Sequence, residues 1–478
     1  MAGDWDVRVD PGTEPLVWAP AMSRRDRRAA RKREQRHHRL RQGAFALGAL
    51  LVVSGGVLAT NTLIRSSAGP EPDTSATVAG TSVTRSSSNV DIDVGTGASP
   101  ISTDRSTEEV PSSLVSPTSL VPPTGPLAPV AAVPAEARSV RLMFSGDMIP
   151  HTPLVARAAA NGKANGERYD FDPMLASIRP IISSADIAIC HLESPISPDD
   201  VKVTGFPTFN APVELAHAIA VAGYDGCSVA SNHALDAGRT GVGRTLDALD
   251  ASGLKHAGTA RSAQERATAT TYVANGVKVA HLSYAYGING QKVPADQPWL
   301  VNIIDPNKII ADAHAAKVAG ADIVVVSLHC CVEYQHTPAP LQKQLADTLL
   351  ASDDIDLIVG HHAHVIQPIA KVHGKVVSYG LGNLLTNQSS LCCVPETQDG
   401  MILDVSFSGT PGSGRFAVDE LRAHPTWVDR DGGYIVTPVV AALADPATPA
   451  PRRALLEASL VRTTQQLQSM GVPVDTTG

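Results

Sequence analysis

The sequence predicts an α/β domain over residues 138–440, and two patterns support this fold class. Short apolar runs rich in branched residues recur along the region, each bounded by Gly or polar residues, as is typical of buried strands. Ala/Leu-rich segments with helical spacing lie between several of these runs. Such alternation indicates helices that cover the faces of a sheet. Because 478 residues exceed what one core usually supports, we also expect accessory segments outside this domain.

The individual elements follow from the same patterns in chain order. The predicted strands are 140–144, 187–190, 227–230, 277–282, 323–328 and 355–359, and the predicted helices are 174–183, 213–221, 242–251, 308–318 and 341–351. From residue 371 the pattern changes to hairpin-like strands at 375–379, 401–407 and 434–439, with a Gly-rich turn at 409–414. An amphipathic segment at 452–470 predicts a helix that caps the domain, within a C-terminal extension of residues 441–478.

The N-terminal part predicts a signal-anchor. Residues 24–41, within a basic tail of residues 1–42, carry ten Arg or Lys, and residues 43–64 then contain no charge. At about 1.5 Å per helical residue, the uncharged stretch spans roughly 33 Å, which matches a bilayer core. The basic residues before it predict a cytoplasmic N-terminus, a single transmembrane helix and an extracytoplasmic C-terminal domain. A cleaved signal peptide is the main alternative, but its basic region would be unusually long.

The stretch between the span and the folded region has the composition of a spacer. Of residues 66–137, 33 of 72 are Ser, Thr or Pro, and none is aromatic. Because such a segment buries little apolar surface, we expect a disordered linker at 65–137. Beyond residue 65 the chain has 27 basic and 41 acidic residues, a net charge of −14, which argues against nucleic acid as a partner.

Potential metal ligands follow five of the predicted strands. In chain order these strand ends carry Asp147; Glu193; Asn232, His233 and Asp236; His329; and His361, His362 and His364. Strand ends are the usual place for a site in an open α/β sheet, and mixed oxygen and imidazole donors suit Zn, Mn or Fe. Each residue also has a purely structural interpretation, as a helix cap, a turn residue or a solvated side chain. Among the histidines, His362 and His364 are favoured because residues two apart on a strand point the same way.

Six segments resemble, in order and spacing, the CapA family of poly-γ-glutamate capsule biosynthesis proteins, which are related to the calcineurin-like metallophosphoesterases. These segments are Gly146-Asp147-Met148, Leu192-Glu193, residues 231–238, His329-x-x-x-Glu333-Tyr334, residues 360–365 and residues 379–383. The resemblance implies a four-layer α/β/β/α sandwich of the metallophosphatase type with two divalent metal ions, either Mn, Fe or Zn.

The resemblance also implies roles for particular residues. Asp147, Glu193 and His364 would hold the first metal, and Glu193, Asn232, His329 and His362 the second. His233 would act in catalysis, either by protonating a leaving group or by stabilising the charge of the transition state, with Asp236 to orient it. Contacts to the substrate or to the ligands would come from His151, Glu333, Tyr334, His361 and Asn383.

The sequence departs from the family pattern at several positions. Calcineurin-like enzymes usually follow the first Asp with x-His, where this chain has Met148-Ile149, and CapA relatives commonly have an Arg near the place of His151. His151 could serve there as an anion contact, or it could only begin a helix. After His329, where the family often shows Trp-Gly, the chain has Cys330-Cys331.

The six cysteines fall into two groups. Cys330-Cys331 and Cys392-Cys393 both follow site-bearing segments, so in an oxidising exterior we expect one or two disulfides between the two pairs. A thiolate metal ligand is the alternative. Cys190 and Cys227 lie in apolar runs and are expected to be buried thiols.

Three functions fit these observations. The first is a membrane-anchored metal-dependent hydrolase or transferase, metallophosphoesterase-like, that acts in the cell envelope on poly-γ-glutamate or a related polymer. The second is a non-catalytic export or assembly subunit that keeps the fold and binds an anionic polymer or a membrane synthase complex. The third is a metal-dependent phosphodiesterase.

Overall fold

The computed structural model describes residues 136–197, 202–413 and 415–477. The predicted basic tail, the predicted span at 43–64 and all of the predicted linker up to residue 135 lie outside these residues. Within the described ranges, no helix combines the length and the apolar character needed to cross a bilayer.

The first of two large sheets has eight strands and carries half of the site described below. Its order is β16-β15-β14-β1-β2-β5-β6, and β13 pairs with β1. The strands are β1 (Arg138–Met148), β2 (Ile187–Leu192), β5 (Gly226–Ser228), β6 (Lys255–Ala257), β13 (Asn383–Leu385), β14 (Asp399–Thr410), β15 (Arg415–Asp429) and β16 (Ile435–Pro438). Strands β1, β2, β5 and β6 run parallel, whereas β14 to β16 extend the sheet in antiparallel order.

The second sheet has six strands in the order β11-β12-β10-β9-β8-β7. They are β7 (Thr270–Ala274), β8 (Val277–Ala285), β9 (Ile323–His329), β10 (Leu357–His361), β11 (Ile369–Val372) and β12 (Lys375–Ser378). The four central strands are parallel, and the edge strands β7 and β11 are antiparallel to their neighbours. A small pair, β3 (Ile196–Ser197) and β4 (Ala211–Pro212), lies apart from both sheets.

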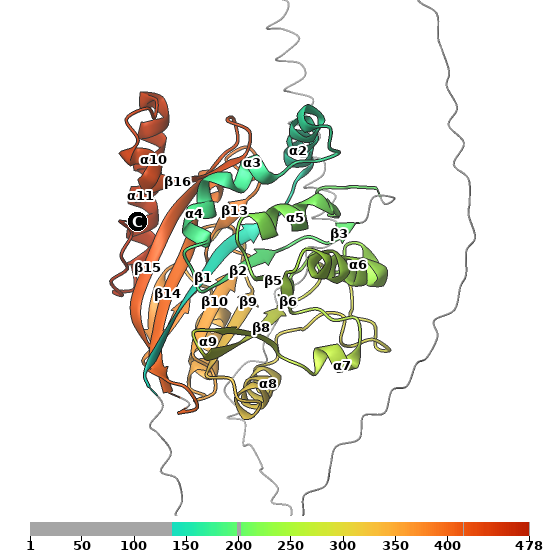
Figure 1. Ribbon diagram of the computed structural model, residues 1–478, viewed down its shortest axis with the longest axis vertical. Helices are drawn as coiled ribbons and strands as arrows, with labels where there is room; N and C mark the ends of the chain where they lie inside the picture. Colours follow the sequence, from blue (N-terminus) through green and yellow to red (C-terminus); the bar gives the residue numbers. More distant parts are fainter. Residues whose placement is uncertain (1–135, 198–201, 414, 478) are drawn as a thin grey trace, which may run out of the picture. The chain divides into compact units, whose positions relative to one another are not determined.

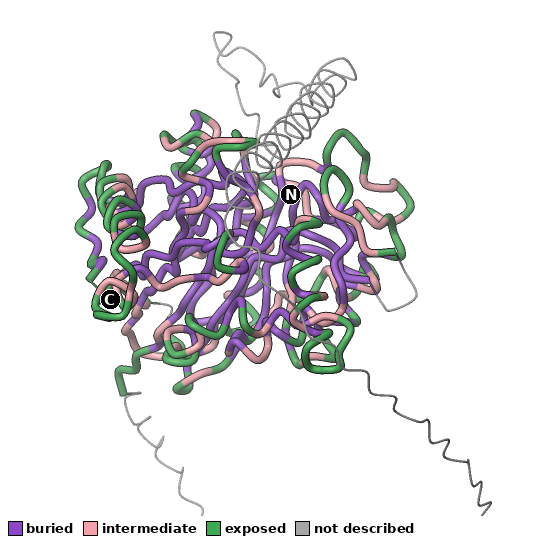
Figure 2. Tube along the Cα trace, turned by 90° about the horizontal axis from the view of Figure 1, so that it is seen from above, coloured by how far each residue is buried: buried purple, intermediate pink, exposed green. Residues whose placement is uncertain are grey.

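Residue alternation along the strands divides the core into layers. In β1, Leu142 and Phe144 join the same apolar cluster as Val279 of β8 and Val325 of β9, so this cluster lies between the two sheets. Because neighbouring strand residues point to opposite faces, Met143 contributes instead to a second core on the outer face of the eight-stranded sheet. The mixed α/β class is therefore confirmed, and its buried interior is visible in Figure 2.

Helices cover the outer face of each sheet (Figure 1). The eight-stranded sheet packs against α2 (Thr152–Asn165), α3 (Asp172–Leu175), η1 (Ala176–Ile178), α4 (Arg179–Ile182), α5 (Glu214–Val221) and α6 (Gly238–Ala251). The six-stranded sheet packs against α8 (Pro306–Val318) and α9 (Pro340–Leu350). The remaining helices are α7 (Ala263–Arg266), η2 (Pro395–Gln398), α10 (Val439–Ala444) and α11 (Ala450–Leu467). Helices α10 and α11 pack on Trp427 of β15.

Most predicted elements are present, with two instructive differences. The helix predicted at 174–183 is broken into α3, η1 and α4, because Pro180 has no backbone N–H to continue one helix. Strand β15 was not predicted, since its first half alternates exposed and half-buried positions instead of forming an apolar run. Pairing with β14 holds it in place.

Candidate metal centre

The predicted ligands meet where the parallel strands of both sheets end. Asp147 is the penultimate residue of β1, Glu193 directly follows β2, and His329 is the last residue of β9. Asn232 follows β5, and the histidines of 361–364 close β10. All of these side chains are buried, as expected for groups that converge at the carboxyl ends of strands in two packed sheets.

Two groups of donors share the carboxylate of Glu193. In one group, ligand atoms of Asp147, Glu193 and His364 lie within 4.8 Å of one another, and in the other the same holds for Glu193, His329 and His362. Oδ1 of Asn232 lies 2.8 Å from Nε2 of His329 and so adjoins the second group. The two donor sets expected from the sequence are thus brought together around a common carboxylate, in an arrangement compatible with divalent metal ions.

Unpartnered buried atoms provide a test of this fit. Both carboxylate oxygens of Glu193 and Nδ1 of His362 are buried without a hydrogen-bond partner among the described residues. Glu193 is 0% exposed, so each of its oxygens loses its hydration without gaining a hydrogen bond in return. A divalent cation on either side of the carboxylate would satisfy these atoms. The side chains present therefore fit a centre for divalent metal ions.

Burial and neighbouring charges shift the pKa values of the ligands in the centre. Burial raises the pKa of Glu193 to about 7. Burial also opposes the charged form of His364, but the carboxylates of Glu193 and Asp147 outweigh it and raise the pKa of His364 to about 10. Burial lowers the pKa of His362 to about 4 and, aided by the neighbouring imidazoles, holds that of His329 well below its ordinary value. His362 and His329 are thus held neutral, the form in which an imidazole binds a metal, whereas His364 is protonated in the metal-free protein and a cation would have to displace its proton.

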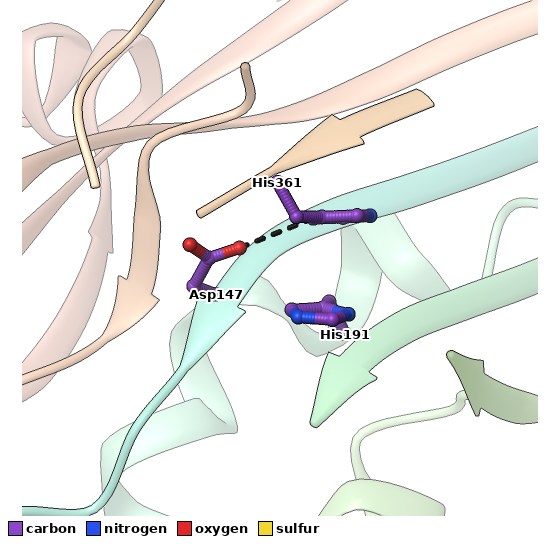
Figure 3. Close-up of side chains that lie close together, drawn as sticks. All are labelled: Asp147, His191 and His361. Atoms are coloured by element: carbon purple, nitrogen blue, oxygen red, sulfur yellow. Dashed lines mark hydrogen bonds and ion pairs between the residues drawn. The ribbon is translucent and has the colours of Figure 1, made fainter. Parts of the chain in front are cut away.

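A third side of the centre contains a histidine that was not assigned a role from the sequence (Figure 3). Nδ1 of His361 lies 3.1 Å from Oδ1 of Asp147, and the ring of His191 stacks on His361 with centroids 4.0 Å apart. His191 also places Nε2 2.9 Å from Nδ1 of His329 and Nδ1 2.7 Å from Oγ of Ser228. It therefore holds His329 by its second nitrogen, a contact that fixes ring orientation at metal sites. Its position near the end of β2, two residues before Glu193, was the available signal.

The strand-alternation reason for favouring His362 and His364 was wrong. Strand β10 ends at His361, and His362 and His364 both adopt left-handed backbone conformations, with φ of 85° and 56°. Strained backbone of this kind concentrates at functional sites. The backbone N–H of His362 donates to Oδ2 of Asp147 at 3.0 Å, which anchors the turn and presents both imidazoles to Glu193.

His233 and Asp236 form the pair expected from the sequence. Nδ1 of His233 lies 2.6 Å from Oδ2 of Asp236, and that oxygen also accepts the backbone N–H of Phe209 at 2.8 Å. Asn289, from the loop after β8, was not foreseen. Its Oδ1 accepts the amide N–H of Asn232 at 3.2 Å, which leaves Oδ1 of Asn232 directed to His329.

The remaining predicted residues have diverse surroundings. Asn383 is buried with Oδ1 3.0 Å from Nδ1 of His364 and so holds that ring. Glu333 is exposed, with a carboxylate oxygen near His362 and His364, and Tyr334 packs its ring 6.0 Å from His364. His151 precedes α2 without capping it by its side chain, and its Nδ1 lies 2.9 Å from the carbonyl of Ile149.

The cysteine predictions were wrong in both respects. The sulfur atoms pair within each adjacent couple, Cys330 with Cys331 and Cys392 with Cys393, so no bridge joins the two couples. Cys190 and Cys227, expected as free thiols, form a disulfide. They are register partners on the neighbouring strands β2 and β5, with Cα atoms 4.4 Å apart, and only strand pairing creates this proximity.

Comparison with known proteins agrees with this geometry. The family model for "Bacterial capsule synthesis protein PGA_cap" matches residues 141–388, which include every strand end of the centre. The chain belongs to this family. It is 29% identical over 229 residues to the capsule biosynthesis protein CapA of Bacillus anthracis, covering 46% of this chain and 55% of the relative. It is 33% identical over 198 residues to the PGA biosynthesis protein CapA of Bacillus subtilis, covering 41% and 50%.

The PGA_cap chain therefore spans about half the length of the curated relatives it matches. Among solved structures, the calcineurin-like phosphoesterase YfkN of Bacillus subtilis matches with a TM-score of 0.34 and 14% identity, over 69% of this chain and 98% of that one. A score this low supports no inference about activity.

Proposed function

We propose that this PGA_cap protein is a two-metal hydrolase or transferase that acts on poly-γ-glutamate or a related anionic polymer of the cell envelope. The observation on which this depends is the buried Glu193 carboxylate, unpartnered at both oxygens and shared by two donor sets. We take the packed sheets with helices on both outer faces as the four-layer sandwich of the metallophosphoesterases. The relatives' names supply the substrate class.

Two divalent cations, Mn, Fe or Zn, would supply Lewis-acid stabilisation of developing charge and an activated water. The protein's own residues account for the rest. The imidazole of His233 is held through Nδ1 by Asp236, which leaves Nε2 as the nitrogen that can transfer a proton to a leaving group. Asn289, His191 and Asn383 hold the side chains of Asn232, His329 and His364 in place.

The proposed location follows from the N-terminal sequence. An uncharged segment at 43–64 preceded by a basic tail would anchor the chain in the cell membrane, with the folded domain outside. Protease treatment of intact cells should then remove the domain. Full protection of the domain would contradict this placement.

A second candidate function is a non-catalytic assembly subunit that retains the fold. The first donor set favours it, because Asp147 is followed by Met148-Ile149 and only three side chains serve that position, whereas four serve the other. Such a subunit would bind one metal ion tightly or none, and would contact the polymer or a membrane synthase.

One experiment separates these functions. Metal content and metal-dependent hydrolysis of γ-glutamyl and phosphodiester substrates would be measured on the purified full-length chain, on Glu193→Gln and on His362→Ala. Two bound metals with γ-glutamyl cleavage that both variants abolish would support the first function. Cleavage confined to phosphodiesters would indicate a phosphodiesterase, and the absence of bound metal and of any turnover would favour the assembly subunit.

A further inference from the structure

Two arginines near the candidate metal centre lack carboxylate partners. Arg430 lies in the turn between β15 and β16, and Arg157 lies on α2; neither forms an ion pair with any described residue. By contrast Arg452, on α11, forms an ion pair with Asp429, the residue that precedes Arg430. The described residues include 25 basic and 32 acidic side chains, so an unpaired guanidinium is not explained by a shortage of carboxylates.

The guanidinium of Arg430 is only partly satisfied. One terminal nitrogen, Nη2, donates to Oδ1 of Asn387 at 3.0 Å, but Nε is buried without a hydrogen-bond partner. Of the acidic residues that flank it in the chain, Asp429 is engaged by Arg452 and by the backbone N–H of Gly432, and Asp431 is exposed. A carboxylate that arrives from solvent would therefore meet the terminal nitrogens of Arg430 and not its buried Nε.

The turn holds this group rigidly. Asp429 accepts the N–H of Gly432 through its side chain and that of Tyr434 through its carbonyl, both at 2.7 Å. Tyr434 has a φ of 64°, in the left-handed region, and its hydroxyl donates to Oδ1 of Asn387 at 2.8 Å. Gly433, with φ of 99°, leaves room for Arg157, because a Cβ built there would lie 3.0 Å from Nε of that arginine. Both guanidinium groups therefore adjoin one turn.

Asn387 connects this turn to the metal centre. It lies four residues after Asn383, which holds His364, and four residues span at most about 14 Å. Its backbone N–H points to Nδ1 of His151 at 3.4 Å. The ring of His151 meets Phe209 edge-on at 5.2 Å, and Phe209 in turn meets His233 at 4.8 Å. Asn387, His151 and Phe209 thus lie between Arg430 and His233, which places the arginines on the rim of the centre and not in contact with the proposed proton donor.

We propose that Arg430 and Arg157 form a carboxylate-binding subsite on this rim, which holds a free α-carboxylate of a γ-linked glutamyl chain. A γ-linked polymer keeps one α-carboxylate on every residue, so an ionic contact beside the centre would set its register against the reacting bond. This inference rests on the proposed function for its ligand. Arg430 and Tyr434 lie beyond the residues 141–388 that match the family model.

Binding of a fluorescein-labelled γ-glutamate pentamer, followed by anisotropy at low salt, tests the subsite. The full-length chain would be studied with chelator present, so that no turnover occurs and the metals contribute nothing. Loss of a charge-assisted hydrogen bond should weaken binding roughly 10-fold to 100-fold in Arg430→Gln, and by a smaller factor in Arg157→Gln. The wild type should bind a pentamer whose α-carboxyls are primary amides as weakly as Arg430→Gln binds the acid.

Arg415→Gln is the matched control. Arg415 is also exposed and unpaired among the described residues, but it begins the 15-residue strand that ends next to Arg430, roughly 45 Å away at about 3.3 Å per residue. The Arg415→Gln variant should bind the acid pentamer with the affinity of the wild type. Thermal unfolding of each variant checks folding, and Arg157→Gln tests the subsite from a different element should the β15–β16 turn not tolerate substitution.

Equal affinity of the wild type for acid and amide pentamers would overturn the subsite, as would equal losses in Arg415→Gln and Arg430→Gln or no binding at all. Failure of the proposed function would appear separately, as absence of metal-dependent γ-glutamyl turnover in the metal-loaded wild type. The two failures are therefore distinguishable.

Discussion

Replacing Glu193 by glutamine should stabilise the metal-free protein while removing its response to metal. In the folded chain the pKa of Glu193 is raised from 4.5 to about 7 by burial. Between these values the folded state binds more protons than the unfolded state, so stability falls as pH rises through this range. At 1.36 kcal/mol per pKa unit, the ionised carboxylate costs the metal-free protein about 3 kcal/mol at pH 8. A neutral amide carries no such penalty.

The corresponding shift in Tm follows from the size of the domain. With an unfolding entropy of about 2.1 cal/mol/K per residue over roughly 340 residues, 3 kcal/mol corresponds to about 4 °C. In chelator at pH 8, Glu193→Gln should therefore unfold about 4 °C above the wild type, and the difference should vanish near pH 4.5. Added Mn²⁺ at about 100 times its Kd should raise the wild-type Tm by a similar amount per site and leave the variant nearly unchanged.

Thermal unfolding followed by circular dichroism, with and without chelator, measures both effects. Glu457→Gln is the control, because Glu457 is exposed on α11 and its replacement should alter neither the pH profile nor the metal response. A metal-free Glu193→Gln that is less stable than the wild type at pH 8, or one that retains the full metal-induced shift, would refute the view that burial of this carboxylate destabilises the metal-free protein and that cations offset the cost.

Three further predictions concern the residues around the centre. Asn289→Ala should weaken metal affinity roughly 10-fold to 100-fold, because the side-chain amide of the ligand Asn232 loses the partner that orients it. Competition with a chromophoric chelator measures this affinity, and an unchanged value would show that Asn289 does not support the metal ligands. Asp236→Asn should lower kcat about 100-fold with metal content unchanged, since His233 loses the partner that holds its tautomer; a wild-type kcat would exclude His233 as the proton donor. Replacing Cys190 and Cys227 together by Ala should cost about 2–4 kcal/mol of unfolding free energy in urea, because their disulfide closes a loop with a separation of 37 residues; no change would mean that the bridge does not form in solution.

The candidate centre illustrates what local sequence can predict. Asp147, Glu193 and His329 were found because each follows an apolar run, and the ends of parallel strands must meet. The roles of His362 and His364 were anticipated for the wrong reason, since a left-handed turn and not strand alternation presents them. Nothing in a single sequence distinguishes those two conformations.

Other residues were missed because their roles depend on partners far along the chain. His191 was given no role, because its contact with His329 joins two sheets across 138 positions. Arg430 carries no motif at all, and its place beside the centre depends on the pairing of β15 with β14 and β16 and on Asn387.

The sequence by itself determined the α/β class, the order of the strands along the chain and the donor types at their ends, because hydrophobic periodicity and chemical identity are local properties. Tertiary structure alone decided which cysteines pair, which imidazole supports which ligand, and which arginines remain without a carboxylate. These outcomes depend on the register between strands and on packing between sheets, where a shift of one residue turns a side chain to the opposite face.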